Sequence, residues 1–146
     1  MTQKIDEEEI RRLSVEIRFL EETAEAIQSR IRMLNAAISD LTYASMTLEG
    51  LEKEGENAEL LVPIGGNSYI KARLQSADKV TVGIGAGISI EKTIQEAKEI
   101  VRKRIEELEK SREELQRQFS QVIARIQEDQ DRLQKIAATL TQEKNK

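Results

Sequence analysis

Apolar residues recur at alternating steps of three and four along the first fifty residues of the chain. One series is Ile10, Ile17, Ala24, Ile31, Ile38 and Ser45, and the other is Leu13, Leu20, Ile27, Leu34, Leu41 and Leu48. These series occupy the two core positions of a coiled-coil heptad. The pattern predicts one helix from about Asp6, as its N-cap, to about Leu51, with a length of about 65 Å at about 1.5 Å per residue.

A second long helix is predicted from about Ile90 to about Thr141. Its core series are Ile105, Arg112, Phe119, Ile126, Leu133, Leu140 and Val101, Leu108, Leu115, Val122, Asp129, Ile136. The polar residues Arg112 and Asp129 interrupt these series, and a polar core residue usually lowers stability while it fixes register. Because the two stripes match in length, we expect the helices to pair antiparallel within one chain. Two separate coiled coils with other chains are the alternative.

The residues between the two helices have a different pattern. Gly50 and Gly55 mark the end of the first helix. Short apolar runs then follow in two pairs, namely Glu59–Ile64 with Ser68–Leu74 and Lys79–Ile84 with Ile88–Ile90. A glycine-rich turn separates the members of each pair, which indicates two successive β-hairpins. Pro63 inside the first strand indicates an edge or a bulge there.

Four short strands cannot form a stable sheet alone, since they expose strand edges and bury little apolar area. We therefore expect the hairpins to assemble with other subunits and to contribute to an oligomeric β-barrel platform. The predicted assembly residues are Leu61, Val62, Ile64, Tyr69, Ile70, Val80, Val82, Ile84 and Ile88. The predicted fold is mainly α, a single unit over residues 1–146 with a helix at about 5–51, hairpins at about 59–90 and a helix at about 90–142.

Composition supports long helices and narrows the classes of function. Charged residues make up 34% and aromatic residues 3% of the chain, as is typical of coiled coils. The 23 basic and 27 acidic residues are mixed along the chain, so we expect no nucleic-acid binding. No apolar run is long enough for a membrane span, the acidic N-terminus is unlike a signal peptide, and cysteine is absent. We therefore expect a soluble cytoplasmic protein without membrane contact.

Chemistry-bearing residues are few. The chain has no histidine and no cysteine, which removes the usual general base and most zinc sites. The segment from Gly83 to Gly87 lacks the spacing and the lysine of a phosphate-binding loop. Paired glutamates such as Glu106 and Glu107 fall on a charged outer face. We therefore predict no enzymatic activity, no cofactor and no metal.

The connector carries a family resemblance. The stretch ELLVPIGGNSYIKARL, from Glu59 to Leu74, is followed by KVTVGIGAGISIEKTIQEA, from Lys79 to Ala97. Flanked by heptads on both sides, this stretch resembles the alpha class of prefoldin subunits. The resemblance implies a hexamer of two alpha and four beta subunits with a β-barrel platform. It also implies coiled-coil tips that hold unfolded polypeptides without ATP, for transfer to a group II chaperonin.

A protein that holds unfolded chains needs exposed apolar side chains near its tips. Val15 and Phe19 lie off the core series at i,i+4 spacing, and Ile123 lies beside the second core series. The predicted client-binding residues are Ile5, Ile10, Leu13, Val15, Phe19, Ile123, Ile126, Leu133, Ile136 and Leu140. Scattered surface apolar residues are an alternative explanation for Val15 and Phe19. The alternative functions are a coiled-coil scaffold without chaperone activity and a prefoldin-like assembly subunit.

Overall fold

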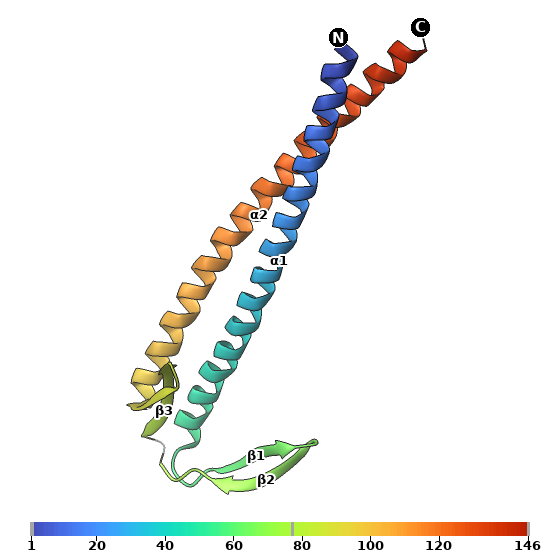
Figure 1. The fold of residues 1–146 in the computed structure, drawn as a ribbon. Coiled ribbons are helices and arrows are strands. Elements are labelled where there is room, and N and C mark those ends of the chain that lie inside the picture. Colours follow the sequence, from blue (N-terminus) through green and yellow to red (C-terminus); the bar gives the residue numbers. More distant parts are fainter. Residues whose placement is uncertain (1, 77, 146) are drawn as a thin grey trace. The chain divides into compact units, whose positions relative to one another are not determined.

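The computed structural model describes residues 2–76 and 78–145 and consists of two long helices with two β-hairpins between them in the chain (Figure 1). The elements are α1 (Thr2–Glu54), β1 (Glu59–Gly65), β2 (Ser68–Arg73), β3 (Lys79–Gly85), β4 (Ile88–Thr93) and α2 (Ile94–Lys144). The predicted mainly α class with two hairpins is confirmed. Two compact units are present: a terminal unit (residues 1–35 and 110–146) and a hairpin unit (residues 36–109).

The ends of the helices differ from the sequence-based expectation. Helix α1 already begins at Thr2, so Asp6 lies inside the helix, and its prediction as the N-cap was wrong. At the other end, Gly55 has a φ of +75° and its amide donates to the carbonyl of Leu51 at 3.1 Å, a common way to end a helix. Strand β4 continues through Thr93, and the Thr93 hydroxyl then accepts a 3.1 Å hydrogen bond from the amide of Glu96. This N-cap starts α2 at Ile94, four residues later than expected.

The heptad pattern describes the helix packing well. Every residue of the four predicted core series is buried or half-buried. In the terminal unit, Glu9 pairs with Arg132 and Glu16 with Arg125, so residue numbers rise along α1 as they fall along α2. In the hairpin unit, Glu52 near the end of α1 pairs with Lys98 near the start of α2. Within each unit, the two helices therefore pair antiparallel, as expected.

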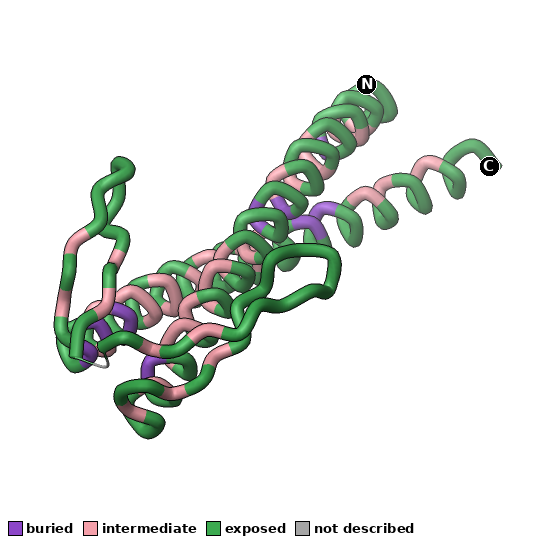
Figure 2. The backbone as a smooth tube through the Cα atoms, turned by 90° about the horizontal axis from the view of Figure 1, so that it is seen from below, coloured by how far each residue is buried: buried purple, intermediate pink, exposed green. Residues whose placement is uncertain are grey.

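The core of the hairpin unit lies where the two helices meet the second hairpin. Leu48, Ala97 and Val101 form its buried centre, and the half-buried Val80 and Val82 of β3 pack against them. Arg104 of α2 also binds β3, since its guanidinium donates a 2.7 Å hydrogen bond to the carbonyl of Gly83. In Figure 2 the buried residues lie on the helices, whereas the hairpins are exposed or half-buried. The β3–β4 hairpin is thus held by the helices of its own chain.

The two hairpins have the same strand pairing, and equivalent residues are twenty positions apart in the sequence. Glu59 pairs with Arg73, and Lys79 pairs with Thr93, in the same antiparallel register (59 to 79 and 73 to 93 are both twenty residues apart). The register of each hairpin shifts near its turn, between Pro63 and Gly65 and between Gly83 and Gly85, which confirms a bulge next to the proline. The turns Gly66-Asn67 and Ala86-Gly87 both have positive φ at their two residues, the geometry of a type I′ turn.

Ala86 stands in a backbone conformation that suits glycine. Its φ is +52°, and the equivalent position of the first hairpin is Gly66. Replacing Ala86 with glycine is expected to raise the free energy of unfolding by about 0.5–1 kcal/mol, because the left-handed strain at an L-residue exceeds the added entropy of the unfolded chain. The shift is measured as the urea midpoint by circular dichroism.

Gly87→Ala is the matched control for this substitution. A Cβ at Gly87 would have no atom within 4 Å, so its effect reports the backbone alone at a φ of +74°. This control is expected to lower the urea midpoint. An unchanged or lower midpoint for Ala86→Gly would contradict the strain at Ala86.

Candidate functional site

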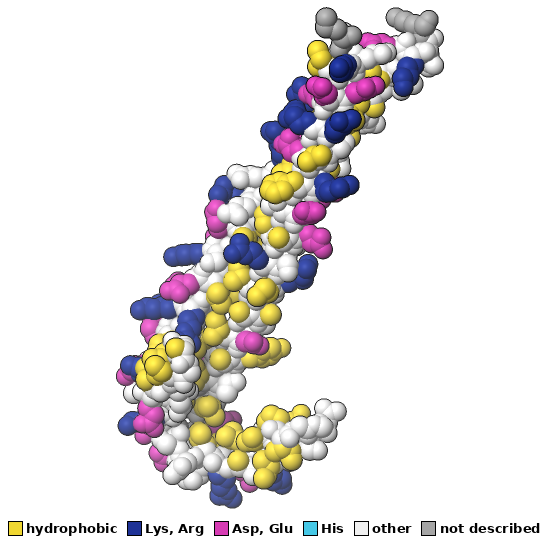
Figure 3. Space-filling view, viewed as in Figure 1, with side chains coloured by type: hydrophobic (Ala, Val, Ile, Leu, Met, Phe, Trp, Pro, Cys, Tyr) yellow, Lys and Arg dark blue, Asp and Glu magenta, His cyan; other side chains and the backbone are white. Residues whose placement is uncertain are grey.

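Four of the predicted client-binding side chains are open to solvent in the terminal unit. Val15 and Phe19 are each 66% exposed, Ile5 is 62% exposed and Ile123 is 44% exposed. Figure 3 shows apolar side chains in small patches between charged ones on the visible face of these helices. Isolated apolar residues are common on protein surfaces, but these four lie on the two helices of one unit and offer apolar contact area that remains exposed in the fold.

The other predicted client-binding residues belong to the seam between the helices. Leu13 is 1% exposed and Ile126 is 8% exposed. Ile10, Leu133, Ile136 and Leu140 are half-buried. Contact of another molecule with Leu13 or Ile126 therefore requires the helices to separate. The half-buried residues are already partly exposed to solvent.

Ion pairs close one side of the seam in the terminal unit. Arg132 Nη2 lies 2.5 Å from Glu9 Oε1, and Arg125 Nη2 lies 3.1 Å from Glu16 Oε1. Arg12 of α1 lies 3.5 Å from Glu9 and 3.7 Å from Glu16, which continues the row of charges. The hydrogen bond to Glu16, with Asp129 close by, holds the pKa of Arg125 above its ordinary value. These pairs fix the register of the helices near the chain ends.

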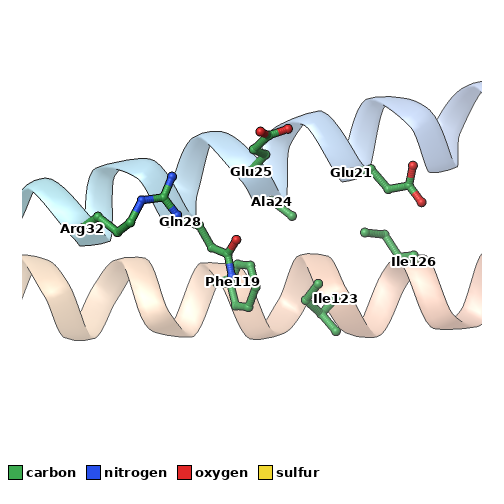
Figure 4. Close-up of a pocket in the computed structure, with 8 residues that line it drawn as sticks. All are labelled: Glu21, Ala24, Glu25, Gln28, Arg32, Phe119, Ile123 and Ile126. Carbon is green, nitrogen blue, oxygen red and sulfur yellow. The ribbon is translucent and has the colours of Figure 1, made fainter.

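A groove of about 500 Å³ lies along the helix pair of the terminal unit. It is lined by Glu21, Ala24, Glu25, Gln28 and Arg32 of α1 and by Phe119, Ile123 and Ile126 of α2. Figure 4 shows Phe119 and Ile126 between the two helices and the carboxylate of Glu25 turned away from α2. Sequence reasoning did not predict this groove, since it counts Phe119 as a seam residue; the position of Ile123 beside the seam was the available signal.

The hairpin unit presents a second set of exposed apolar residues. Of the nine predicted assembly residues, seven have exposed fractions between 42% and 66%: Leu61, Val62, Ile64, Tyr69, Ile70, Ile84 and Ile88. The remaining two, Val80 and Val82, pack against the helices of their own chain. Each hairpin is a separate two-stranded sheet, and strands of this kind leave unpaired edges that can pair with another chain.

A polar cluster joins the helices next to the hairpins. Glu52 accepts hydrogen bonds from Lys98 at 2.8 Å and from Gln95 at 2.5 Å. The Lys98 hydrogen bond lowers the pKa of Glu52 and raises the pKa of Lys98, so both groups stay charged over a wide pH range. This cluster fixes the start of α2 against the end of α1 and thereby positions β4, which leads directly into α2.

Within residues 2–76 and 78–145, no helix is long and apolar enough to cross a membrane.

Comparison with known proteins places these features in a family. A family model described as "Prefoldin subunit" matches residues 20–143. The prefoldin subunit alpha of Methanosarcina barkeri is 34% identical over 127 residues, covering 85% of this chain and 88% of the relative. That of Methanococcoides burtonii is 36% identical over 120 residues, covering 82% and 87%. A cryo-EM structure of filamentous PFD from Methanocaldococcus jannaschii matches with a TM-score of 0.69 and 28% identity, covering 79% of this chain and 95% of that chain.

Proposed function

The chain belongs to the prefoldin family of co-chaperones, and we propose that it holds unfolded polypeptides at the ends of its paired helices without using ATP. The observation that carries this proposal is the group of four exposed apolar side chains in the terminal unit, Ile5, Val15, Phe19 and Ile123. Holding an unfolded chain needs adaptable apolar area and no reactive group. The half-buried seam residues toward the chain ends add to that area.

The strength of such contact favours several weak sites acting together. Burial of about 300 Å² of apolar area at one helix pair would give several kcal/mol, at about 25 cal/mol per Å², before the ordering of the client is subtracted. A single pair of helix ends would therefore bind weakly. Several such pairs in one complex gain by effective concentration, which gives a physical reason for an oligomer.

The hairpins are the proposed means of assembly. Seven exposed apolar residues and the unpaired strand edges support their contact with other subunits. We infer that the partners are prefoldin beta subunits and a second alpha subunit, arranged as a hexamer of two alpha and four beta subunits around a β-barrel platform. The proposal also includes transfer of clients to a group II chaperonin in the cytoplasm.

A truncation tests the proposed site. The chain lacking residues 1–12 and 134–146, assembled with its cognate beta subunit, loses Ile5 and the half-buried Ile10, Ile136 and Leu140 but keeps Val15, Phe19 and Ile123. It is expected to suppress the aggregation of an unfolded client several-fold less well. The intact complex is expected to suppress that aggregation. Aggregation is followed by turbidity, and light scattering first confirms that the truncated chain still assembles. Equal behaviour of the two assembled complexes would contradict client binding at these outermost turns.

A further inference from the structure

The deepest layer of the seam in the terminal unit is half apolar and half charged. Leu13 is 1% exposed and Asp129 is 5% exposed. Along the helix axis, the ion pair between Glu9 and Arg132 lies nearer to the chain ends than these two residues, and the ion pair between Glu16 and Arg125 lies further from the chain ends. Leu13 lies four residues after Glu9 and three before Glu16, and Asp129 lies four residues after Arg125 and three before Arg132. These two residues therefore lie at nearly the same level of the helix pair.

The carboxylate of Asp129 is poorly satisfied. Its Oδ2 atom is buried and has no hydrogen-bond partner among the residues that the structure describes. Its Oδ1 atom lies 3.6 Å from Nε of Arg125, and the same guanidinium also binds Glu16 at 3.1 Å. A buried oxygen without a partner disfavours the state that buries it, and parting of the helices would return it to water.

Burial is unequal on the two sides of this layer. Toward residue 35 of α1, the seam contains buried residues, Ala24 and Ile27 of α1 and Ile126 of α2, between others that are half-buried. Toward the chain ends, the seam residues Ile10, Leu133, Ile136 and Leu140 are only half-buried. Figures 1 and 2 both show α2 diverging from α1 toward the two termini. Among the residues that the structure describes, Leu13 and Asp129 thus form the buried layer nearest to the chain ends.

We propose that Asp129 sets the point at which the helix pair opens. The turns between this layer and the chain ends part and close as one segment, while the helices on the other side of the layer stay paired. Opening would present Ile10, Leu133 and Ile136 to an apolar client segment, so this inference rests on the proposed function and extends it. Asp129 acts through the seam and need not touch the client.

Arg112 provides a matched comparison, because it is the other polar residue in the core series of α2. Its guanidinium donates a 3.0 Å hydrogen bond to Oδ1 of Asn35, and it is only half-buried. A satisfied polar residue fixes register without favouring separation. Of these two residues, only Asp129 combines deep burial with an oxygen atom that has no hydrogen-bond partner among the described residues.

Hydrogen exchange of the assembled complex tests the opening point. With Asp129→Leu, the amides of residues 5–12 and 130–144 are expected to exchange at least about tenfold more slowly than in the unmodified complex, which corresponds to about 1.4 kcal/mol of opening free energy. With Arg112→Leu, exchange of these amides is expected to stay unchanged. If Asp129→Leu fails to assemble, Asp129→Asn takes its place, since it removes the charge at nearly constant volume, and a smaller slowing is expected.

Two exchange results would overturn the inference. One is unchanged exchange of the terminal turns in the Asp129 variant. The other is equal slowing throughout both units, which would mean that Asp129 lowers overall stability and marks no opening point.

Client binding provides a second readout. The Asp129→Leu complex is expected to suppress aggregation several-fold less well than the unmodified complex, because its ends stay closed. Slower exchange with unchanged suppression would overturn the role of opening in client capture. The exchange experiment contains no client, so its failure is distinct from a failure of the proposed function, which the truncation tests.

Discussion

Placing opposite charges on the β1–β2 hairpin, by Val62→Asp with Ile70→Lys, is expected to abolish incorporation of the chain into a complex with its partner subunits. Val62 and Ile70 are directly paired across the hairpin, so their side chains lie on one face. They are 42% and 55% exposed, and the two new charges attract each other, so the single chain should fold as before. An assembled complex would have to bury these charges without suitable partners, which is expected to weaken association by at least about a thousandfold.

The measurement is size-exclusion chromatography with light scattering after mixing with the cognate beta subunit. The matched control is the exchange of Glu59 and Arg73, Glu59→Arg with Arg73→Glu, because these residues are also paired on the same hairpin and keep their opposite charges. This control is expected to assemble normally. Normal assembly of the Val62 and Ile70 variant would show that the first hairpin is not an assembly surface.

Replacing Val15, Phe19 and Ile123 with serine is expected to remove most of the suppression of client aggregation while assembly is kept. The three side chains are exposed, so their loss leaves the seam intact and costs the fold little. It removes about 25 cal/mol of possible binding free energy for each Å² of apolar area that a client would cover. Summed over the two alpha subunits of the proposed hexamer, this loss is expected to lower the suppression at least tenfold.

A control with other strongly exposed apolar residues separates position from general surface hydrophobicity. Met33, Tyr43 and Met46 are 61–70% exposed and lie further along α1. Their triple replacement with serine is expected to leave suppression nearly unchanged. Equal losses in the two triple variants, measured by turbidity at matched complex concentration, would indicate that clients bind along the whole of α1 and not at the helix ends.

The helices were predictable because burial follows the heptad pattern residue by residue. From Ile10 to Leu48 and from Val101 to Leu140, each predicted core residue is at least half-buried. The start of α2 was placed too early, since Ile90 continues the apolar pattern of the strand as well as that of the helix. The sequence Thr93-Ile-Gln-Glu96 carried the missing signal, a capping box, and the structure uses its threonine as the N-cap.

The surroundings of the candidate site were less predictable, because they depend on which residues face each other across the seam. Periodicity identifies Asp129 as an interruption of the core but does not reveal that Leu13 shares its layer. The pairing of Glu9 with Arg132 sets that register, and many other shifts of the two helices would align equally apolar stripes. The exposure of Val15 and Phe19 follows from the heptad alone, whereas the groove beside Phe119 needs the actual register.

The antiparallel pairing has a consequence for the time course of biosynthesis. Glu52 and its partner Gln95 are 43 residues apart in sequence, whereas Glu16 and Arg125 are 109 residues apart. The N-terminal helix therefore leaves the ribosome on the order of ten seconds before its partner segment, at about 10 residues per second. Contacts beside the hairpins close the shorter loop, so pairing is expected to start there and to proceed as a zipper, with the segment that carries Val15 and Phe19 the last to gain its partner.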